Sequence, residues 1–279
     1  MHMHKVKLYY DNELPNFGDE LNIFIVRKLN LTAEYAPLES CNAIFIGSLL
    51  GRFFSKRLWL TRRLLGLMLL KPRVLVWGGG YVEINNRKDM RLFRRLDVRA
   101  CRGFLTLERL RQCRHAKIAE NIVCADPGLL ASRFIDTSHV KKKYKLGIIP
   151  HYVDKDNYLL SNITVENSVI IDIQQPPEVF MNTLAECENV LSSALHGLIA
   201  ADSLGIPNAR LVLSDKIKGG DYKYNDYYSA FGLKSHMRVN LAEGQFTDGD
   251  IDTISSAYAI KQEQVTQLQD ALLHSFPYK

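Results

Sequence analysis

The chain has 279 residues, 47% of them hydrophobic, and a formal net charge of +6. That length suits one large domain or two of ordinary size, and the composition excludes a collagen, a disordered tail and a disulfide-stapled mini-protein. The charge is divided unevenly, because residues 1–145 hold 27 Lys and Arg against 13 Asp and Glu, whereas residues 146–279 hold 9 against 17. A basic half of charge +14 is therefore joined to an acidic half of charge −8.

The cysteines and the apolar runs indicate the compartment. The five cysteines form no CxxC pair, which favours reduced, buried thiols in a cytoplasmic protein and predicts no metal site. The N-terminus lacks the apolar stretch of a signal peptide. The most apolar segment, residues 58–70, contains Arg62 and Arg63 and falls short of the ~18–20 uncharged residues that a membrane-spanning helix needs. We therefore expect a cytoplasmic chain without a spanning helix.

Apolar runs alternate with stretches of helical period along most of the chain, which is typical of βαβ units in a parallel α/β fold. In chain order, we expect strands at residues 5–10, 42–46, 73–77, 98–101, 121–125, 145–150, 169–173, 189–192 and 209–213. Between and after them, we expect helices at residues 19–29, 103–113, 178–186, 196–204 and 252–273. The architecture predicted is two Rossmann-like doubly wound domains, residues 1–145 and 146–279, that face each other across a cleft.

In such folds ligands bind beyond the carboxyl ends of the strands, so the loops there carry the candidate residues. Residues 16–22, NFGDELN, follow the first strand, and free N–H groups beside Gly18 could hold an anion or a sugar hydroxyl. A plain capped loop is the alternative interpretation. Residues 77–81, WGGGY, place three glycines after a buried strand, which is unfavourable unless a ligand or another backbone segment comes close.

Two charged side chains follow the next strands of the first half. Arg102 comes directly after the strand at residues 98–101, where a bidentate donor would suit a carboxylate or a phosphate. An arginine on the surface is the alternative. Asp126 precedes Pro127 at the end of the following strand, either as a stop to the strand or as a carboxylate in the cleft.

The most informative motif of the second half is SSALHGL, residues 192–198, between a strand and a helix. His196 would lie at the helix N-terminus, where it can donate or accept a proton. His151, at the end of the first strand of this half, is a second candidate. Residues 216–228 interleave lysines with tyrosines around a Gly-Gly turn and could grip a phosphate while stacking a sugar ring. A flexible surface loop is the alternative.

The order of these motifs resembles the polysaccharide pyruvyl transferase family over about residues 5–232. Residues 216–228 look like the branch that acts on bacterial exopolysaccharide intermediates, the glucosyl ketal-pyruvate transferases. The resemblance implies a GT-B-like arrangement and a reaction that takes the carboxyvinyl group of phosphoenolpyruvate and installs it as a pyruvate ketal on two sugar hydroxyls. Many members have an arginine where this chain has Ala194.

Ketal formation from an enol phosphate needs an acid or base and cations for the anionic donor, but no nucleotide, metal or redox cofactor. The catalytic candidates are His196, His151 and Asp126. The donor-binding candidates are Arg102, Lys216, Lys218, Lys223, Gly197 and Ser193. The acceptor-binding candidates are Asn16, Gly18, Asp19, Glu20, Gly78, Gly79, Gly80 and Tyr81.

Two other functions remain open on the sequence: a GT-B glycosyltransferase that uses a nucleotide sugar, and a catalytically silent, carbohydrate-binding relative. The basic half would also suit a nucleic-acid-binding protein. However, aromatic residues are not interleaved with the basic residues of 87–117, and no recognition motif occurs. We therefore expect no nucleic-acid partner.

Residues 52–73 contain seven basic residues and no acidic one, mixed with Trp, Phe and Leu. An interfacial segment on an anionic bilayer has this pattern, and so does a core helix with a basic outer face. Acceptors of the family that this chain resembles are typically carried on membrane lipids. We therefore expect a lipid-linked saccharide as acceptor and a peripheral position on the inner face of the cytoplasmic membrane.

Overall fold

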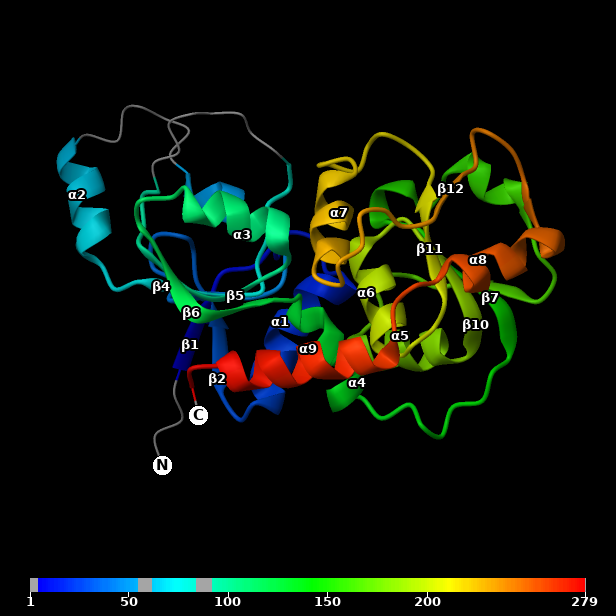
Figure 1. Cartoon of the computed structure of the whole chain (residues 1–279), viewed down its shortest axis with the longest axis horizontal. Helices are drawn as coiled ribbons and strands as arrows, with labels where there is room; N and C mark the ends of the chain where they lie inside the picture. The colour runs from blue at the N-terminus through cyan, green and yellow to red at the C-terminus, as the bar shows by residue number, and fades with distance from the viewer. Residues whose placement is uncertain (1–4, 55–61, 84–91, 279) are drawn as a thin grey trace.

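The strands form two large parallel sheets, one from each half of the chain. The computed structural model describes residues 5–54, 62–83 and 92–278 (Figure 1). The first sheet has six strands in the order β2-β1-β3-β4-β5-β6, the second has five in the order β12-β11-β10-β7-β9, and β13 pairs with β8. Neighbouring strands in these sheets run parallel. The prediction of an α/β fold with parallel sheets is confirmed.

The bounds of most elements lie close to those expected. The strands are β1 (Lys5–Leu8), β2 (Thr32–Tyr35), β3 (Ala43–Ile44), β4 (Val74–Trp77), β5 (Leu96–Cys101), β6 (Ala116–Cys124), β7 (Tyr144–Ile149), β8 (Ile163–Thr164), β9 (Ser168–Ile170), β10 (Cys187–Ser192), β11 (Asn208–Val212), β12 (Arg238–Asn240) and β13 (Phe246–Thr247). The helices are α1 (Phe17–Lys28), α2 (Arg62–Leu70), α3 (Phe104–Arg111), α4 (Ala131–Phe134), α5 (Pro177–Ala185), α6 (Leu195–Ser203), α7 (Tyr222–Ser229), α8 (Ile251–Ala257) and α9 (Gln262–Ser275).

Three expected elements differ from the prediction. The strand expected at residues 121–125 begins earlier, at Ala116, as β6. The strand expected at residues 42–46 is only two residues long. The side chain of Asn22 in α1 forms hydrogen bonds with both the N–H and the carbonyl of Ile46, so these groups do not pair with a neighbouring strand. The single helix expected at residues 252–273 is two helices, α8 and α9. The break holds Tyr258 in an extended conformation with its hydroxyl donating to Asp202, 3.0 Å away, and α9 restarts after the capping residue Lys261.

The lysine- and tyrosine-rich stretch is neither a wholly flexible loop nor a surface for stacking sugars. Its second part is helix α7, and Tyr224, Tyr227 and Tyr228 are all buried. Their spacing of three and four residues places them on one face of the helix, so they join the core. The tyrosines therefore fix α7 in place.

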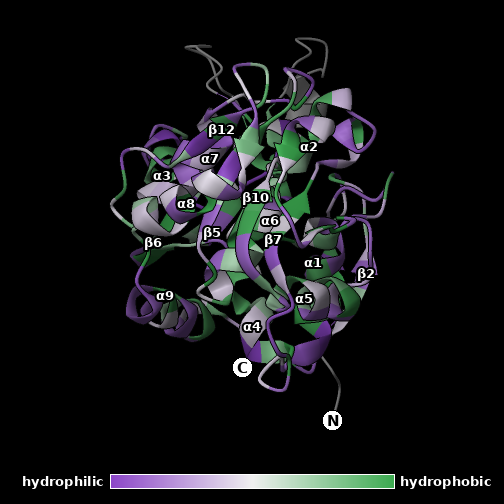
Figure 2. Ribbon diagram, turned by 90° about the vertical axis from the view of Figure 1, so that its right-hand side faces the viewer, coloured by the Kyte–Doolittle hydropathy of each residue, from purple (hydrophilic) through white to green (hydrophobic). Residues whose placement is uncertain are grey.

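The two sheets share one hydrophobic core cluster, which includes Trp77 from the first half and Ile149 from the second. Helix α9 returns to the first sheet, where the indole N–H of Trp77 donates to the carbonyl of Leu272, 3.2 Å away (Figure 1). The outer face of α9 is largely hydrophilic (Figure 2). A hydrogen bond from the backbone N–H of Phe17 to the carbonyl of Ile173, 2.7 Å away, joins the two halves directly.

Candidate active site

A small cavity of about 80 Å³ lies where the two halves meet. The first half contributes Asn16 and Ser48 to its wall, and the second half contributes His151, Ala194, His196 and Lys223. Residues from four of the motifs singled out in the sequence thus come together. This cavity is the candidate active site.

Neighbouring strands bring the second-half residues together. Ile149, at the end of β7, lies opposite Ser192, at the end of β10, so the loops that follow both strands leave the same edge of the sheet. The backbone N–H of His151 donates to the hydroxyl of Ser193, 2.7 Å away, and fixes these loops to each other. Helix α6 starts at Leu195, which places His196 in its first turn.

His196 is partly exposed to the cavity, and its buried Nε2 faces a buried carboxylate. Its Nε2 lies 3.9 Å from Oδ2 of Asp126, and neither atom has a hydrogen-bond partner within the described part of the chain. A Cβ added to Gly18 would lie 2.0 Å from Nδ1 of the imidazole, so the glycine of the NFGDELN motif makes room for the ring. Burial lowers the pKa of His196 to about 3, and the positive charges of Arg102 and Lys223 add to this effect. The imidazole is therefore neutral at pH 7.

Asp126 has two roles because its carboxylate oxygens face different ways. One oxygen, Oδ1, accepts from the N–H of Gly128, 2.9 Å away, and caps the short 3-10 helix Pro127–Leu130. The other faces His196. Burial raises the pKa of this carboxyl to about 6, although the bond from Gly128 and the charge of Arg102 oppose the rise. Asp126 can therefore hold or release a proton near neutral pH.

His151 and Lys223 complete the polar wall. The backbone N–H of Val153 donates to Nδ1 of His151, 3.3 Å away, so in the neutral ring Nε2 carries the proton. Burial, reinforced by the charge of Lys223, lowers the pKa of His151 to about 4. Lys223 is half-buried, and burial together with Arg102 and Arg210 lowers its pKa to about 7.

Arg102 lies behind the cavity and is fully engaged with protein groups. Its Nε donates to Asp226 at 2.9 Å, its Nη1 to the hydroxyl of Ser48 at 2.8 Å, and its Nη2 to the carbonyl of Tyr81 at 2.5 Å. Both members of the Arg102–Asp226 pair are buried. The arginine expected to bind a donor thus joins β5 to α7, and it reaches the cavity through Ser48 and through its charge.

The glycines of the WGGG motif lie against protein atoms. A Cβ on Gly78, whose φ is +103°, would lie 1.9 Å from Pro127 Cδ, and one on Gly80 would lie 2.4 Å from Arg102 Cζ. The neighbouring Tyr81 is buried beside Cys113. These glycines let the end of β4 pack closely under Asp126-Pro127 and Arg102, and they do not line the cavity.

The other expected residues are distributed around the site. Asn16 lines the cavity and caps α1 by accepting from the N–H of Asp19, 3.2 Å away. Burial raises the pKa of Asp19 to about 7, and Glu20 is exposed. A Cβ on Gly197 would lie 2.3 Å from Ser192 Oγ, so this glycine lets α6 pack onto β10.

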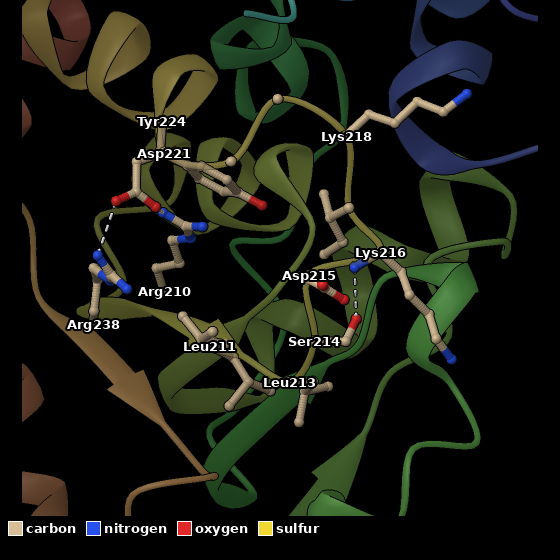
Figure 3. Close-up of a pocket in the computed structure, with 14 residues that line it drawn as sticks. Arg210, Leu211, Leu213, Ser214, Asp215, Lys216, Lys218, Asp221, Tyr224 and Arg238 are labelled. Atoms are coloured by element: carbon tan, nitrogen blue, oxygen red, sulfur yellow. Dashed lines mark hydrogen bonds and ion pairs between the residues drawn. The ribbon is translucent and has the colours of Figure 1, made fainter.

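Lys216 and Lys218 line a different cavity, of about 360 Å³, on the second half (Figure 3). Three residues of the small cavity were not expected from the sequence: Ser48, Tyr152 and Ile173. Ser48 and Tyr152 follow strands that the sequence predicts, and Ile173 is the last residue of one. Their position at the carboxyl end of a strand is the sequence signal that could have identified them. Within the described residues, no group of three His, Cys, Asp or Glu side chains is arranged to hold a metal ion.

Comparisons with known proteins identify a family and several similar proteins. A family model described as polysaccharide pyruvyl transferase matches residues 3–214. The chain is 37% identical over 176 residues to the uncharacterized protein L143 of Acanthamoeba polyphaga mimivirus, covering 57% of this chain and 61% of that protein. It is 22% identical over 231 residues to the succinoglycan biosynthesis protein ExoV of Rhizobium meliloti (strain 1021), covering 82% of this chain and 66% of ExoV.

The chain thus spans less than two thirds of the length of each of these curated relatives. A crystal structure of the uncharacterized protein KP1_0663 from Klebsiella pneumoniae subsp. pneumoniae NTUH-K2044 is also similar, with a TM-score of 0.43, 14% identity, and coverage of 80% of this chain and 87% of that one. The family model covers well over half of the chain and includes the segments that form the small cavity up to His196. The chain belongs to the polysaccharide pyruvyl transferase family.

Proposed function

We propose that this chain transfers a pyruvyl group from phosphoenolpyruvate to a saccharide, as a ketal, and that His196 moves the protons. The observation that carries the proposal is the pair formed by His196, which lines the cavity together with Lys223, and the buried carboxylate of Asp126 behind it. Membership of the family supports the reaction class. The proposal includes a GT-B-like arrangement in which residues 1–145 and 146–279 form two domains around the site.

The small cavity suits an anionic donor of about three carbons. Lys223 supplies a positive charge, and the Nε2–H of His151 supplies a hydrogen-bond donor for a carboxylate or phosphate oxygen. A bound anion favours the protonated form of a neighbouring imidazole, so donor binding raises the pKa of His196 from its low value in the free protein. Binding of the donor therefore prepares the proton that the reaction needs.

The bonds that form and break require two hydroxyl protons to be relocated. The methylene carbon of phosphoenolpyruvate gains a proton, and a sugar oxygen bonds to the adjacent carbon. The bond from that carbon to the phosphate oxygen breaks, and the second sugar oxygen takes its place. One hydroxyl proton ends on the new methyl group and the other leaves with phosphate. The protonated His196 can deliver its proton to the methylene carbon and then accept the first hydroxyl proton, with Asp126 as a second proton-holding group.

The direct test is the variant His196→Gln, with phosphate release from phosphoenolpyruvate measured in the presence of a saccharide acceptor. Loss of a general acid–base group should lower the rate by about 10²- to 10⁴-fold. The melting temperature should stay close to that of the wild type. His139 is exposed and far along the chain from the site, so His139→Gln is the matched control. Near-normal turnover in His196→Gln would contradict the proposal.

The proposed acceptor is lipid-linked, and residues 52–73 are proposed to contact an anionic membrane. Residues 55–61 of this segment lie outside the described residues. Within α2, Leu67 and Leu70 are 54% and 76% exposed, and α2 lies at the outer end of the first half (Figure 1). None of the helices in the described ranges is long and apolar enough to cross a bilayer.

Vesicle flotation tests this contact. We expect the wild type to float with vesicles that contain an anionic lipid and not with neutral ones, because apolar and basic groups act together at such a surface. The variant Leu67→Gln/Leu70→Gln should stay at the bottom of the gradient. Binding that is indifferent to lipid charge, or no binding, contradicts this part of the proposal.

A further inference from the structure

Ser48 lines the small cavity, and the hydrogen bonds around it leave one group unused. The Nη1 of Arg102 donates to the Ser48 hydroxyl, 2.8 Å away. A guanidinium can only donate, so the hydroxyl oxygen is the acceptor in this bond and its own proton is free for another partner. No acceptor for that proton occurs within the described part of the chain. Ser48 therefore has a hydrogen bond to donate at the wall of the cavity.

The backbone on both sides of Ser48 is held in place. Gly47 has a φ of +124°, which favours glycine, and its carbonyl accepts from the N–H of Gly80, 3.0 Å away. Two residues after Ser48, the N–H of Leu50 donates to the carbonyl of Gly80, 3.1 Å away. The last glycine of the WGGG motif thus fixes the loop that carries the serine. A hydroxyl fixed in this way loses little freedom when it binds a ligand.

Arg102 strengthens Ser48 as a donor. Hydrogen bonds in a chain polarise one another, so a hydroxyl that accepts from a guanidinium becomes a better donor itself. Arg102 is buried, is bound to Asp226 and to the carbonyl of Tyr81, and does not itself line the cavity. The hydroxyl of Ser48 is therefore the group through which this arginine can act on a ligand.

The rest of the wall suits an anion. Lys223 and the Nε2–H of His151 are donors, and no Asp or Glu is among the described residues that line the cavity. The amide of Asn16 is already engaged with Asp19, because it accepts from the backbone N–H and donates to the carboxyl group. Helix α6 starts at this wall without a side-chain cap, and the positive end of a helix dipole favours an anion. The unused proton of Ser48 thus borders a space suited to a negatively charged oxygen.

We propose that Ser48 binds the donor of the reaction by donating its hydroxyl proton to an anionic oxygen of phosphoenolpyruvate. This inference rests on the proposed function, because it takes phosphoenolpyruvate as the donor. It gives the first half of the chain a direct part in donor binding, beside Lys223 and His151 of the second half. The loop at residues 47–50, which contains no charged residue, is thereby assigned to an anionic ligand.

Isothermal titration calorimetry with phosphoenolpyruvate tests this assignment. Ser48→Ala should raise the Kd about 10- to 100-fold, the loss expected for a hydrogen bond to a charged group. Ser48→Thr keeps the hydroxyl and should recover most of the affinity. Ser132→Ala is the matched control, because Ser132 is also half-buried and its hydroxyl accepts from the side-chain amide of Gln269, 3.1 Å away, but it lies outside the cavity. This control should bind phosphoenolpyruvate as the wild type does.

Three results would overturn the assignment: a wild-type Kd in Ser48→Ala, an equal loss of affinity in Ser132→Ala, or no recovery in Ser48→Thr. A wild type that binds no phosphoenolpyruvate would overturn it together with the proposed donor. The two proposals can also fail separately, because Ser48 is tested by binding at equilibrium and His196 by turnover. If His196→Gln kept its turnover while Ser48→Ala bound phosphoenolpyruvate weakly, the proposed proton transfer would fail and the assignment of Ser48 would stand.

Discussion

The two loops that meet at the site carry charges opposite to those of the halves they belong to. Residues 11–20, from the basic half, contain four acidic residues and no basic one. Residues 214–224, from the acidic half, contain three lysines and two aspartates. Asn16 of the first loop and Lys223 of the second line the same small cavity.

The net charge of a half therefore says little about the charge at its functional edge. In the proposed function, the anionic donor is bound by Lys223 of the second half. The first loop contributes Asn16 to the cavity, and Asp19, whose pKa burial raises to about 7, accepts a hydrogen bond from the side chain of Asn16. Each of the following substitutions alters one of the two loops or a contact between the two halves.

The largest effect is expected from the buried pair that joins the halves. Arg102→Gln leaves the buried carboxylate of Asp226 without its ion-pair partner, and removing one partner of a buried pair costs about 3–5 kcal/mol. Asp97→Asn, in the exposed Arg99–Asp97 pair, should cost about 0–1 kcal/mol. Urea denaturation measures both free energies of unfolding. Equal losses in the two variants would show that the buried pair does not hold the halves together.

The next effect concerns the contact between the acidic loop and His196, the proposed proton-transfer group. Gly18→Ala places a Cβ 2.0 Å from Nδ1 of His196, so the ring must move. A displacement of about 1 Å can cost about 100-fold in rate, and we expect a loss of that size in kcat. Gly51→Ala is the control, because its Cβ meets no atom within 4 Å. If both variants retained wild-type kcat, His196 would not be the group positioned by this loop.

The basic loop makes a prediction about pH. Burial lowers the pKa of Lys223 to about 7, so its ammonium is present below pH 7 and is lost as the pH rises above it. If this charge binds the donor, KM for phosphoenolpyruvate should rise up to about tenfold per pH unit between pH 7.5 and 9. Lys223→Arg keeps its charge over this range and should flatten the profile. A wild-type KM that stays constant to pH 9 would remove Lys223 from donor binding.

The smallest effect is expected on the pH dependence of the melting temperature, through Asp19 of the acidic loop. The pKa of Asp19 is raised to about 7 by burial, so the folded protein holds a proton that the unfolded chain releases near pH 4. The stability contributed by this proton is fully present below pH 4 and is lost as the pH rises through 7. Asp19→Asn should therefore reduce the difference between the melting temperatures at pH 5 and pH 8 by about 2 °C. An unchanged difference in Asp19→Asn would contradict the buried state of this carboxyl.

Local patterns predicted much of the fold, because β-strands and amphipathic helices depend on residues close together in the chain. The strand expected at residues 189–192 and the helix expected at 196–204 appear as β10 and α6. Helix α7 was not predicted, because its tyrosines look like surface residues until the core that buries them is known. The contacts within the site were equally hard to predict. Gly18 and His196 are 178 positions apart in the chain, and their contact depends on how the two sheets pack.

The roles of charged residues were the hardest to predict. Arg102 was expected to bind a donor, but its partner Asp226 lies far along the chain and gives no local signal. The sequence does not distinguish between Lys216, Lys218 and Lys223. In the structure, Lys223 in the first turn of α7 lines the small cavity, whereas Lys216 and Lys218 line the larger one. Position beyond a strand end pointed to the residues that line the small cavity, whereas their surroundings depend on tertiary packing.

The most direct test of the central claim is a reaction that follows both products. The wild type, incubated with phosphoenolpyruvate and a saccharide acceptor, should release phosphate and form a pyruvate ketal in equal amounts. The His196→Gln variant should form neither at more than about 1% of that rate. Phosphate release without a ketal, or a ketal formed at the wild-type rate by the variant, would contradict the account.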